Sequence, residues 1–165
     1  MEVCVIVDSL FGNTERLAEA VAQGMALMSV RVLGAGEAIG PATLAGVDVL
    51  VVAGPTTSRG MSPRLRTALD GLDGSVRGMN VALFDTRYRG PEFLMGSAAR
   101  RAEKQLVAAG AVIVVPRESF LVRRTPPAAG GRGAPADVEL EPGELERARE
   151  WGRKLAATFV AGKGA

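Results

Sequence analysis

Short apolar runs alternate with segments of helical periodicity along almost the whole sequence, and this order strongly limits the folds available to the chain. The runs lack polar alternation, which is typical of strands buried on both faces of a parallel sheet. Right-handed crossovers between such strands leave few compact arrangements. We therefore predict an α/β fold of three αβα layers, with a doubly wound five-stranded parallel sheet in the order 2-1-3-4-5. The predicted strands are Glu2–Val7, Val30–Leu33, Val49–Ala53, Asn80–Asp85 and Ala111–Val115, the last continued by Ser119–Val122.

Four helices are predicted between and after these strands. Each has apolar residues at helical spacing on one face, and most begin at a residue whose side chain can accept a backbone N–H. The predicted helices are Thr14–Met28, capped by Asn13 or Thr14; a helix from Ser62-Pro63 to about Leu69–Asp70; a helix from Ser97 to Ala109, ended by Gly110; and Gly143–Val160.

The connection from Arg124 to Glu141 precedes the last helix. Its part Pro126–Gly133 is rich in proline, glycine and alanine, so we expect this part to be mobile. On the last helix, Trp151 is expected at the edge of the buried apolar stripe.

Length and composition exclude several kinds of chemistry. The 165 residues fit a single domain, residues 1–165, and leave no room for a second. The sequence contains no histidine, which excludes Ser-His-Asp and Cys-His catalysis and the usual zinc sites. The single cysteine, Cys4, lies in an apolar run, so we expect a buried and unreactive thiol. No catalytic side chains and no metal ligands are predicted.

Charge and hydropathy indicate where the protein works. The net charge of +2 comes from scattered residues and not from a basic block, so no nucleic-acid partner is expected. No apolar run approaches the roughly 20 residues of a membrane helix, and Met1 is not followed by an export signal. We expect a cytoplasmic protein without a membrane partner, and the sequence does not indicate its oligomeric state.

The loop after the first predicted strand opens directly into a helix. A helix start offers unpaired backbone N–H groups and a partial positive charge, which can hold a phosphate without any lysine. Gly12 allows the backbone to approach an anion closely, and the hydroxyl and amide side chains of the loop add donors. The same pattern fits an ordinary capped turn, so the residues alone leave both interpretations open. The loop consists of Ser9, Leu10, Phe11, Gly12, Asn13 and Thr14.

The pattern Ser-x-Phe-Gly-Asn-Thr after the first strand resembles the FMN phosphate loop of the flavodoxin family. Gly54-Pro55-Thr56 is similar to the family's second flavin loop, and Phe84-Asp85-Thr86-Arg87 stands where its third loop begins. The resemblance implies a flavodoxin-like fold with the FMN phosphate at residues 9–14 and the isoalloxazine ring between the other two loops. The residues implied at the ring are Pro55, Thr56, Thr57, Ser58, Arg59, Gly60, Asp85, Thr86, Arg87 and Tyr88.

The chain departs from the flavodoxin pattern in two respects. Flavodoxins commonly place aromatic side chains on both faces of the ring, whereas the second loop has Thr57 and Ser58 at that position, and Tyr88 is the one aromatic residue suited to the other face. Flavodoxins are also typically acidic, whereas Arg59, Arg87 and Arg89 are expected to surround this site with positive charge. Such charge favours the anionic reduced flavin and therefore a raised reduction potential.

The resemblance implies an FMN-binding electron-transfer protein that serves a redox partner protein or a small electron acceptor. An electron carrier is favoured over an enzyme, although an FMN-dependent reductase of a small acceptor such as a quinone remains a variant. The competing interpretation is a binding or regulatory module that has the fold without the flavin. Dinucleotide, P-loop and aspartyl-phosphate sites are not favoured, because Gly34-Ala35-Gly36 lacks a third glycine, no Walker motif occurs, and Asp8 lacks an acidic neighbour.

Overall fold

A computed structural model of the protein describes residues 1–125 and 137–160. Within these residues, eight strands form one sheet in the order β2-β1-β3-β5-β7-β8, with β4 paired to β3 and β6 paired to β5. The first five strands of this order are parallel, which confirms the predicted 2-1-3-4-5 arrangement, whereas β4 and β8 are antiparallel to their neighbours. The strands are β1 (Glu2–Val7), β2 (Ser29–Gly34), β3 (Val49–Thr57), β4 (Gly60–Met61), β5 (Asn80–Tyr88), β6 (Val112–Ile113), β7 (Glu118–Thr125) and β8 (Asp137–Leu140).

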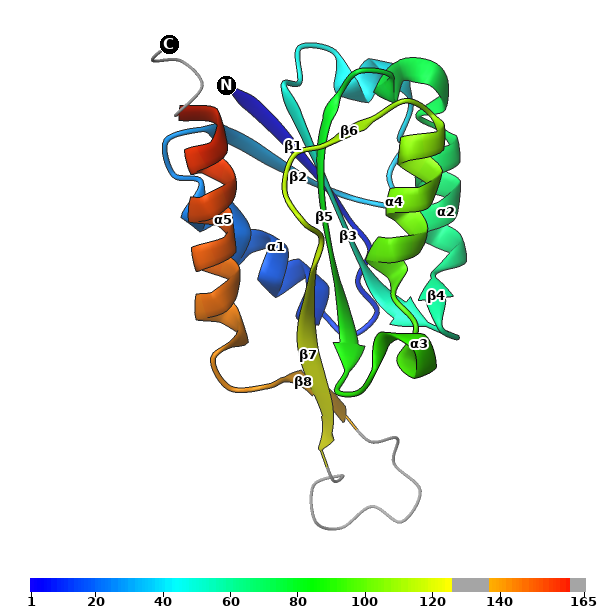
Figure 1. Ribbon diagram of the computed structural model, residues 1–165, viewed down its shortest axis with the longest axis vertical. Coiled ribbons are helices and arrows are strands. Elements are labelled where there is room, and N and C mark those ends of the chain that lie inside the picture. Colours follow the sequence, from blue (N-terminus) through cyan, green and yellow to red (C-terminus); the bar gives the residue numbers. More distant parts are fainter. Residues whose placement is uncertain (126–136, 161–165) are drawn as a thin grey trace.

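Helices cover both faces of the sheet. α1 (Asn13–Gly24) and α5 (Glu144–Val160) lie on one face, and α2 (Pro63–Asp70) and α4 (Ala98–Ala108) lie on the other (Figure 1). The single-turn α3 (Glu92–Met95) and two short 3₁₀ helices, Pro41–Leu44 and Asp73–Val76, occur in the connections. The result is the expected three-layer αβα arrangement.

The predicted caps of α2 and α4 are confirmed. The hydroxyl oxygen of Ser62 accepts a hydrogen bond from the N–H of Leu65 at 3.1 Å, and that of Ser97 accepts one from the N–H of Arg100 at 3.0 Å. The predicted end of α1 at Met28 is wrong, because the helix ends at Gly24. A Cβ at Gly24 would lie 2.2 Å from the carbonyl oxygen of Arg149, so glycine at this position allows α1 and α5 to pack in direct backbone contact.

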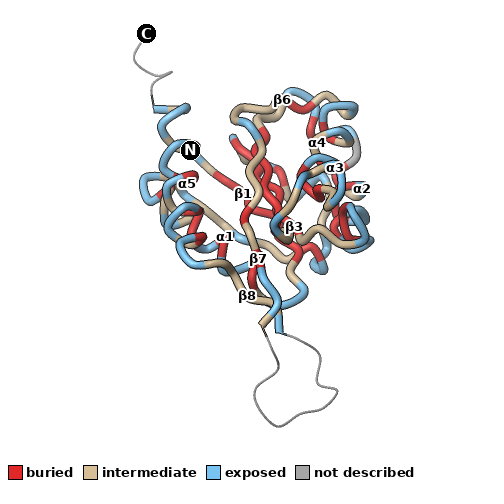
Figure 2. The backbone as a smooth tube through the Cα atoms, turned by 60° about the horizontal axis from the view of Figure 1, so that its bottom comes forward, coloured by how far each residue is buried: buried red, intermediate tan, exposed pale blue. Residues whose placement is uncertain are grey.

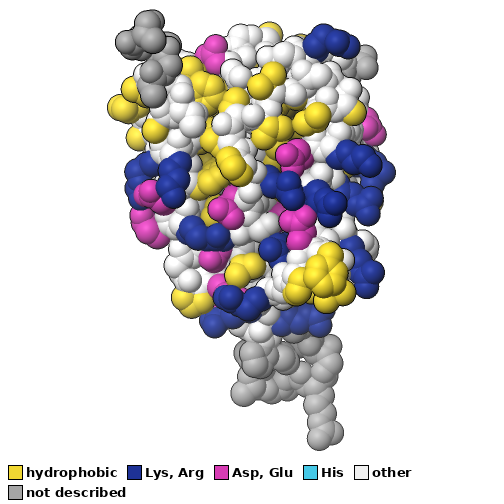
Figure 3. Space-filling view, viewed as in Figure 1, with side chains coloured by type: hydrophobic (Ala, Val, Ile, Leu, Met, Phe, Trp, Pro, Cys, Tyr) yellow, Lys and Arg dark blue, Asp and Glu magenta, His cyan; other side chains and the backbone are white. Residues whose placement is uncertain are grey.

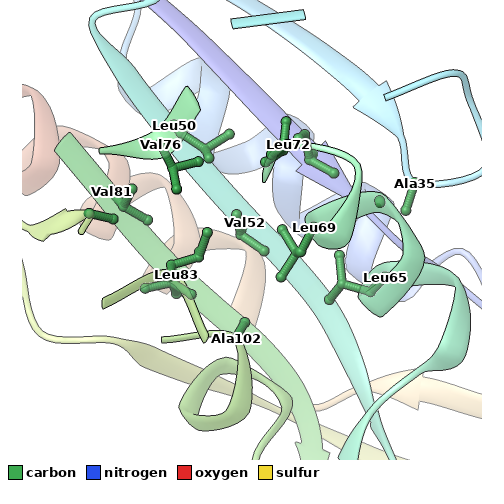
Figure 4. Packing of buried hydrophobic residues seen from close by; sticks show 14 of the residues in the cluster. Ala35, Leu50, Val52, Leu65, Leu69, Leu72, Val76, Val81, Leu83 and Ala102 are labelled. Atoms are coloured by element: carbon green, nitrogen blue, oxygen red, sulfur yellow. The ribbon is translucent and has the colours of Figure 1, made fainter. Parts of the chain in front are cut away.

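The hydrophobic core has two parts, one on each face of the sheet (Figure 2). On one side, Leu50, Val52 and Leu83 of the sheet pack against Leu65 and Leu69 of α2 (Figure 4). The central strands are therefore buried on both faces, as their uninterrupted apolar sequences predicted.

Aromatic residues and Cys4 occupy this interior. Trp151 makes an edge-on contact with Phe84 at a centroid distance of 5.7 Å, and Phe84 makes another with Phe120 at 5.4 Å. Trp151, which was expected at the edge of the buried stripe, is 8% exposed, and its ring packs against Phe84. Cys4 is buried as predicted, and burial raises the pKa of its thiol, which keeps the thiol protonated.

The sheet extends further toward the candidate site than the sequence predicted. β3 continues to Thr57 and β5 to Tyr88, because β3 pairs with β4 and the end of β5 pairs with β7. β8 lies in the connection from Arg124 to Glu141, where no strand was predicted, and it pairs with the end of β7. The expectation that Pro126–Gly133 is mobile falls outside the described residues.

Candidate functional site

The C-terminal ends of the parallel strands meet at one end of the sheet, at the bottom of Figure 1, and bring the three predicted loops together. A pocket of about 70 Å³ lies between them. The predicted residues that line it are Leu10, Phe11, Asn13, Thr14, Pro55, Thr56, Thr57, Thr86, Arg87 and Tyr88. The predicted residues that do not line it are Ser9, Gly12, Ser58, Arg59, Gly60 and Asp85.

The first loop presents backbone donors. Gly12 is the N-cap of α1 and has a left-handed conformation with φ 79°. A Cβ built on this glycine would meet no atom within 4 Å, so the backbone is open on that side. Among the described residues, no protein acceptor receives the backbone N–H groups of residues 10–14. Free N–H groups at a helix start attract an anion, so this loop is suited to a phosphate.

The side chains of the first loop have other roles than the predicted cap. The side-chain N–H of Asn13 donates to the carbonyl oxygen of Val138 in β8 at 2.7 Å. The hydroxyls of Thr14 and Thr86 lie 3.1 Å apart and are buried. The prediction that Asn13 or Thr14 caps α1 is therefore wrong. The helix starts at Asn13, which turns both side chains from the helix end toward the neighbouring strands.

Asp85 is a positioning residue and does not reach the pocket. Its side chain is completely buried, and one carboxylate oxygen accepts hydrogen bonds from the hydroxyl of Thr56 at 3.2 Å, the hydroxyl of Ser97 at 2.5 Å and the N–H of Ala99 at 3.1 Å. The carboxylate thus lies at the positive end of α4. The hydroxyl of Thr56 also accepts the N–H of Ala98 at 3.0 Å. These contacts fix the ends of β3 and β5 to the start of α4.

The second loop forms a tight hairpin between β3 and β4. Its two central residues, Ser58 and Arg59, both have left-handed backbone conformations, with φ 47° and 64°. Hairpin turns of this type normally contain asparagine or glycine, because other side chains cost about 1–2 kcal/mol per residue in this conformation. Gly96 packs directly against the backbone of Arg59, since a Cβ on Gly96 would lie 2.3 Å from its carbonyl oxygen.

One side of the Tyr88 ring is covered by a neighbouring arginine. The guanidinium of Arg124 lies 5.6 Å from the centre of the Tyr88 ring, and its Nε is 3.4 Å from the tyrosine hydroxyl. This contact covers one side of the ring, so the opposite side is the one available to a ligand. The contact between Arg124 and Tyr88 arises from the pairing of β5 with β7, which brings residues 36 positions apart into contact.

The three arginines expected around the site have separate environments. Arg87 lines the pocket and donates from Nη1 to the carbonyl oxygen of Gly90 at 2.7 Å. Arg89 forms an ion pair with Glu141 at 2.5 Å, which offsets its charge. Arg59 lines a different groove on the side of α2 and α4. Of these three arginines only Arg87 lines the pocket, so the expectation is wrong for Arg59 and Arg89. Arg124, which lies over Tyr88, brings a further positive charge next to the pocket.

The two halves of the site fit FMN to different degrees. The first loop, with free N–H groups and open space beside Gly12, matches the requirements of a phosphate. The ring side is narrow, because cofactor pockets usually enclose about 300–1,000 Å³ and this pocket encloses about 70 Å³. Val122 of β7 and Val138 of β8 contribute to its walls. Val138 was missed because β8 was not predicted, whereas Val122 ends the predicted strand Ser119–Val122 but was not assigned to the site.

Comparisons with known proteins agree with this architecture. The structure is similar to a flavodoxin from the domain Archaea, with a TM-score of 0.73 and 19% identity over 95% of this chain and 97% of that chain. It is also similar to flavodoxin 1 from Bacillus cereus, with a TM-score of 0.72 and 17% identity over 98% of both chains. A flavodiiron core from Synechocystis matches with a TM-score of 0.68 and 18% identity, over 98% of this chain and 36% of that longer chain.

No family model and no curated protein matches the sequence. The fold and the position of the pocket define a doubly wound α/β protein with its candidate site at the point where the winding of the sheet reverses. The fold is that of the flavodoxins, as the sequence resemblance implied.

The described part of the chain contains neither a cluster of metal ligands nor a membrane-spanning helix. No group of three or more carboxylate or thiol side chains is arranged to hold a metal ion among residues 1–125 and 137–160. Over the same residues, no helix combines the length and apolar character needed to cross a bilayer.

Proposed function

We propose that the protein binds FMN and transfers electrons between a donor and a redox partner protein or small acceptor. The observation that carries this proposal is the run of free backbone N–H groups at residues 10–14 beside the open side of Gly12. The flavodoxin-like fold supports the same position for the phosphate. When bound, FMN supplies the redox chemistry, and the chain contributes binding, orientation and electrostatics.

In this proposal the residues of the site have distinct tasks. The amides of residues 10–14 hold the phosphate, and the hydroxyls of Thr14 and Thr86 supply further donors next to it. The segment from Pro55 to Thr57 forms one wall of the ring site, and Tyr88 contributes the other wall through the side not covered by Arg124. Asp85 acts indirectly, because it holds these two walls in register through Thr56 and Ser97.

The ring requires more space than the pocket provides. Asn13 and Val138 join the first loop to β8 across the pocket, so FMN binding in this proposal opens that contact. The side-chain N–H groups of Asn13 then become available to the phosphate. The exposed side chains of Leu10 and Phe11, which are 52% and 65% exposed, border the entrance and lose water contact when the ring enters.

Titration of the purified apoprotein with FMN and with riboflavin tests the proposal. Riboflavin has the same ring without the phosphate, so the difference in affinity measures the contribution of the first loop. We expect quenching of flavin fluorescence with FMN and at least about 100-fold weaker binding of riboflavin, since several charge-assisted hydrogen bonds are lost. Equal affinity for both compounds would place the phosphate elsewhere, and no binding of FMN would refute the proposal.

A second function is favoured by the narrow ring pocket and by the lack of an aromatic residue in the second loop. In this alternative the protein is an anion-binding module that uses the first loop alone. Such a module is colourless, ignores FMN and binds inorganic phosphate in calorimetric titrations. The same set of titrations therefore distinguishes the two functions.

A further inference from the structure

A basic groove lies outside the candidate cofactor site, on the side of the molecule formed by α2, α3 and α4. It encloses about 700 Å³, which makes it ten times larger than the pocket at the strand ends. Figure 3 shows Lys and Arg side chains gathered on the α4 side of the molecule, next to hydrophobic side chains over α3. The basic residues that line the groove are Arg59, Arg66, Arg100, Arg101 and Lys104.

Few carboxylates balance this charge. Glu92, the one acidic residue among the described residues that line the groove, lies 3.7 Å from Arg100 but is also bound by Arg117 at 3.1 Å. Arg117 in addition forms an ion pair with Glu103 of α4 at 2.7 Å, so this carboxylate is engaged away from the groove. No described carboxylate lies within 4.0 Å of the cationic groups of the other four basic residues, which are Arg59, Arg66, Arg101 and Lys104.

An exposed aromatic residue lies at the same groove. Phe93 of α3 is 78% exposed and lines the groove, and the adjacent Leu94 is 53% exposed. A large aromatic side chain next to arginines is the composition that dominates binding energy in protein interfaces. Contact of the Phe93 ring with water is unfavourable in the free protein, and a partner that covers the ring removes this contact.

We propose that this groove docks an acidic segment of a partner protein. The carboxylates of this segment pair with Arg66, Arg101 and Lys104, and an apolar residue of the segment covers Phe93. Opposite charges of this kind accelerate association and select the partner. The proposal does not depend on FMN, although the groove borders the hairpin of the second loop through Arg59.

The groove composition favours a protein partner over a nucleic acid. Met61, Ala108 and Phe93 add apolar surface to the groove, which an apolar side chain of a peptide can contact and a phosphate backbone cannot. The net charge of the whole chain is only +2, which provides little of the long-range attraction that nucleic-acid binding uses.

The experiment measures fluorescence anisotropy of a labelled acidic peptide, (Glu-Glu-Leu)₃, with the full chain at low ionic strength. The test variant is Lys104→Glu, and Lys154→Glu is the matched control, because Lys154 is 70% exposed on α5 at the opposite face of the sheet. We expect about tenfold weaker binding for Lys104→Glu and unchanged binding for Lys154→Glu. Circular dichroism verifies that both variants are folded.

Two further probes make the result specific. Phe93→Ser is expected to weaken binding of the leucine-containing peptide and to leave binding of a hexaglutamate peptide unchanged. Only the leucine-containing peptide has an apolar group that can cover the Phe93 ring. A single-stranded oligonucleotide is expected to bind less tightly than the peptide. The proposal is overturned if the wild-type protein does not bind the peptide, if both lysine variants lose binding equally, or if the oligonucleotide binds more tightly and depends on Lys104. Since all of these measurements use protein without FMN, they are independent of the cofactor proposal.

Discussion

The first loop and the two ring-side loops meet at the same end of the sheet but differ in how their polar groups are used. The first loop leaves backbone N–H groups free and has open space at Gly12. On the ring side, Asp85 holds Thr56 and Ser97 in a buried network, and the pocket is narrow. The first region thus has polar groups without a partner among the described residues, whereas those of the second are bonded to one another. Anion binding and ring binding can therefore be tested separately.

The largest effect is expected for Gly12→Val, which changes the first loop. A branched side chain at this position fills the open space and is strained at φ 79°, so we expect the loss of measurable FMN and phosphate binding. Gly46→Val is the matched control, because Gly46 has φ 73° and equally open space but lies before β3, at the opposite end of the strand.

Both glycine variants should lose a similar amount of stability, roughly 1–2 kcal/mol or more, in urea denaturation. Ligand titration then separates the two positions, since Gly46→Val should bind FMN as the wild-type protein does. Retained binding in Gly12→Val would contradict the assignment of the phosphate to the first loop.

The next largest effect is expected on the ring side, where Asp85→Ala removes the centre of the buried hydrogen-bond network. The substitution leaves the hydroxyls of Thr56 and Ser97 and the N–H of Ala99 without their buried acceptor, so the free energy of unfolding should fall by about 2–4 kcal/mol. Asp48→Ala is the control, because its carboxylate accepts one exposed N–H, from Glu2 at 2.8 Å. Urea denaturation measures both, and equal losses would show that the Asp85 network does not hold the strand ends together.

The same comparison shows how far the sequence could predict the structure. The position of the first loop, between a strand and the start of a helix at Gly12, could be predicted because it depends on local signals, whereas its binding of a phosphate stays a prediction. The ring side was predicted less well. Gly54-Pro55 indicated a loop, yet β3 continues to Thr57 because pairing with β4 and β5 outweighs the local preference. The buried position of Asp85 likewise depends on α4, which is distant in sequence.

The contribution of β8 also depended on long-range contacts. Asp137–Leu140 alternates acidic and apolar residues over only four positions, which is a weak strand signal, and its pairing with the end of β7 stabilises the strand. The narrow pocket and the contact between Asn13 and Val138 follow from this pairing, and neither could be inferred from the residues alone. The sheet order, in contrast, follows from the buried apolar runs and from the handedness of crossovers.

A moderate effect is expected where the two regions meet, at the hydroxyls of Thr14 and Thr86. Thr14→Val keeps the shape of the side chain but removes one partner of a buried hydrogen bond, so stability should fall by about 1 kcal/mol. If this hydroxyl also contacts the phosphate, FMN affinity should fall by about fivefold, which corresponds to about 1 kcal/mol. Thr67→Val, at an exposed hydrogen bond on α2, is the control and should change neither quantity appreciably. A loss of stability without loss of affinity would restrict Thr14 to a structural role.

The smallest effect concerns the width of the ring pocket and is tested with Val138→Ala. The substitution shortens a wall of the pocket and leaves the backbone carbonyl that accepts from Asn13 in place, so only the space for the ring changes. If narrowness limits ring entry, FMN and riboflavin should both bind a few-fold more tightly, while the affinity for inorganic phosphate stays the same. Val112→Ala makes the same truncation at the edge-exposed β6, where the side chain is 49% exposed, and should alter none of the three affinities. A change in phosphate affinity without a change in flavin affinity would contradict this expectation. It would show that the Val138 side chain affects the first loop and not the space for the ring.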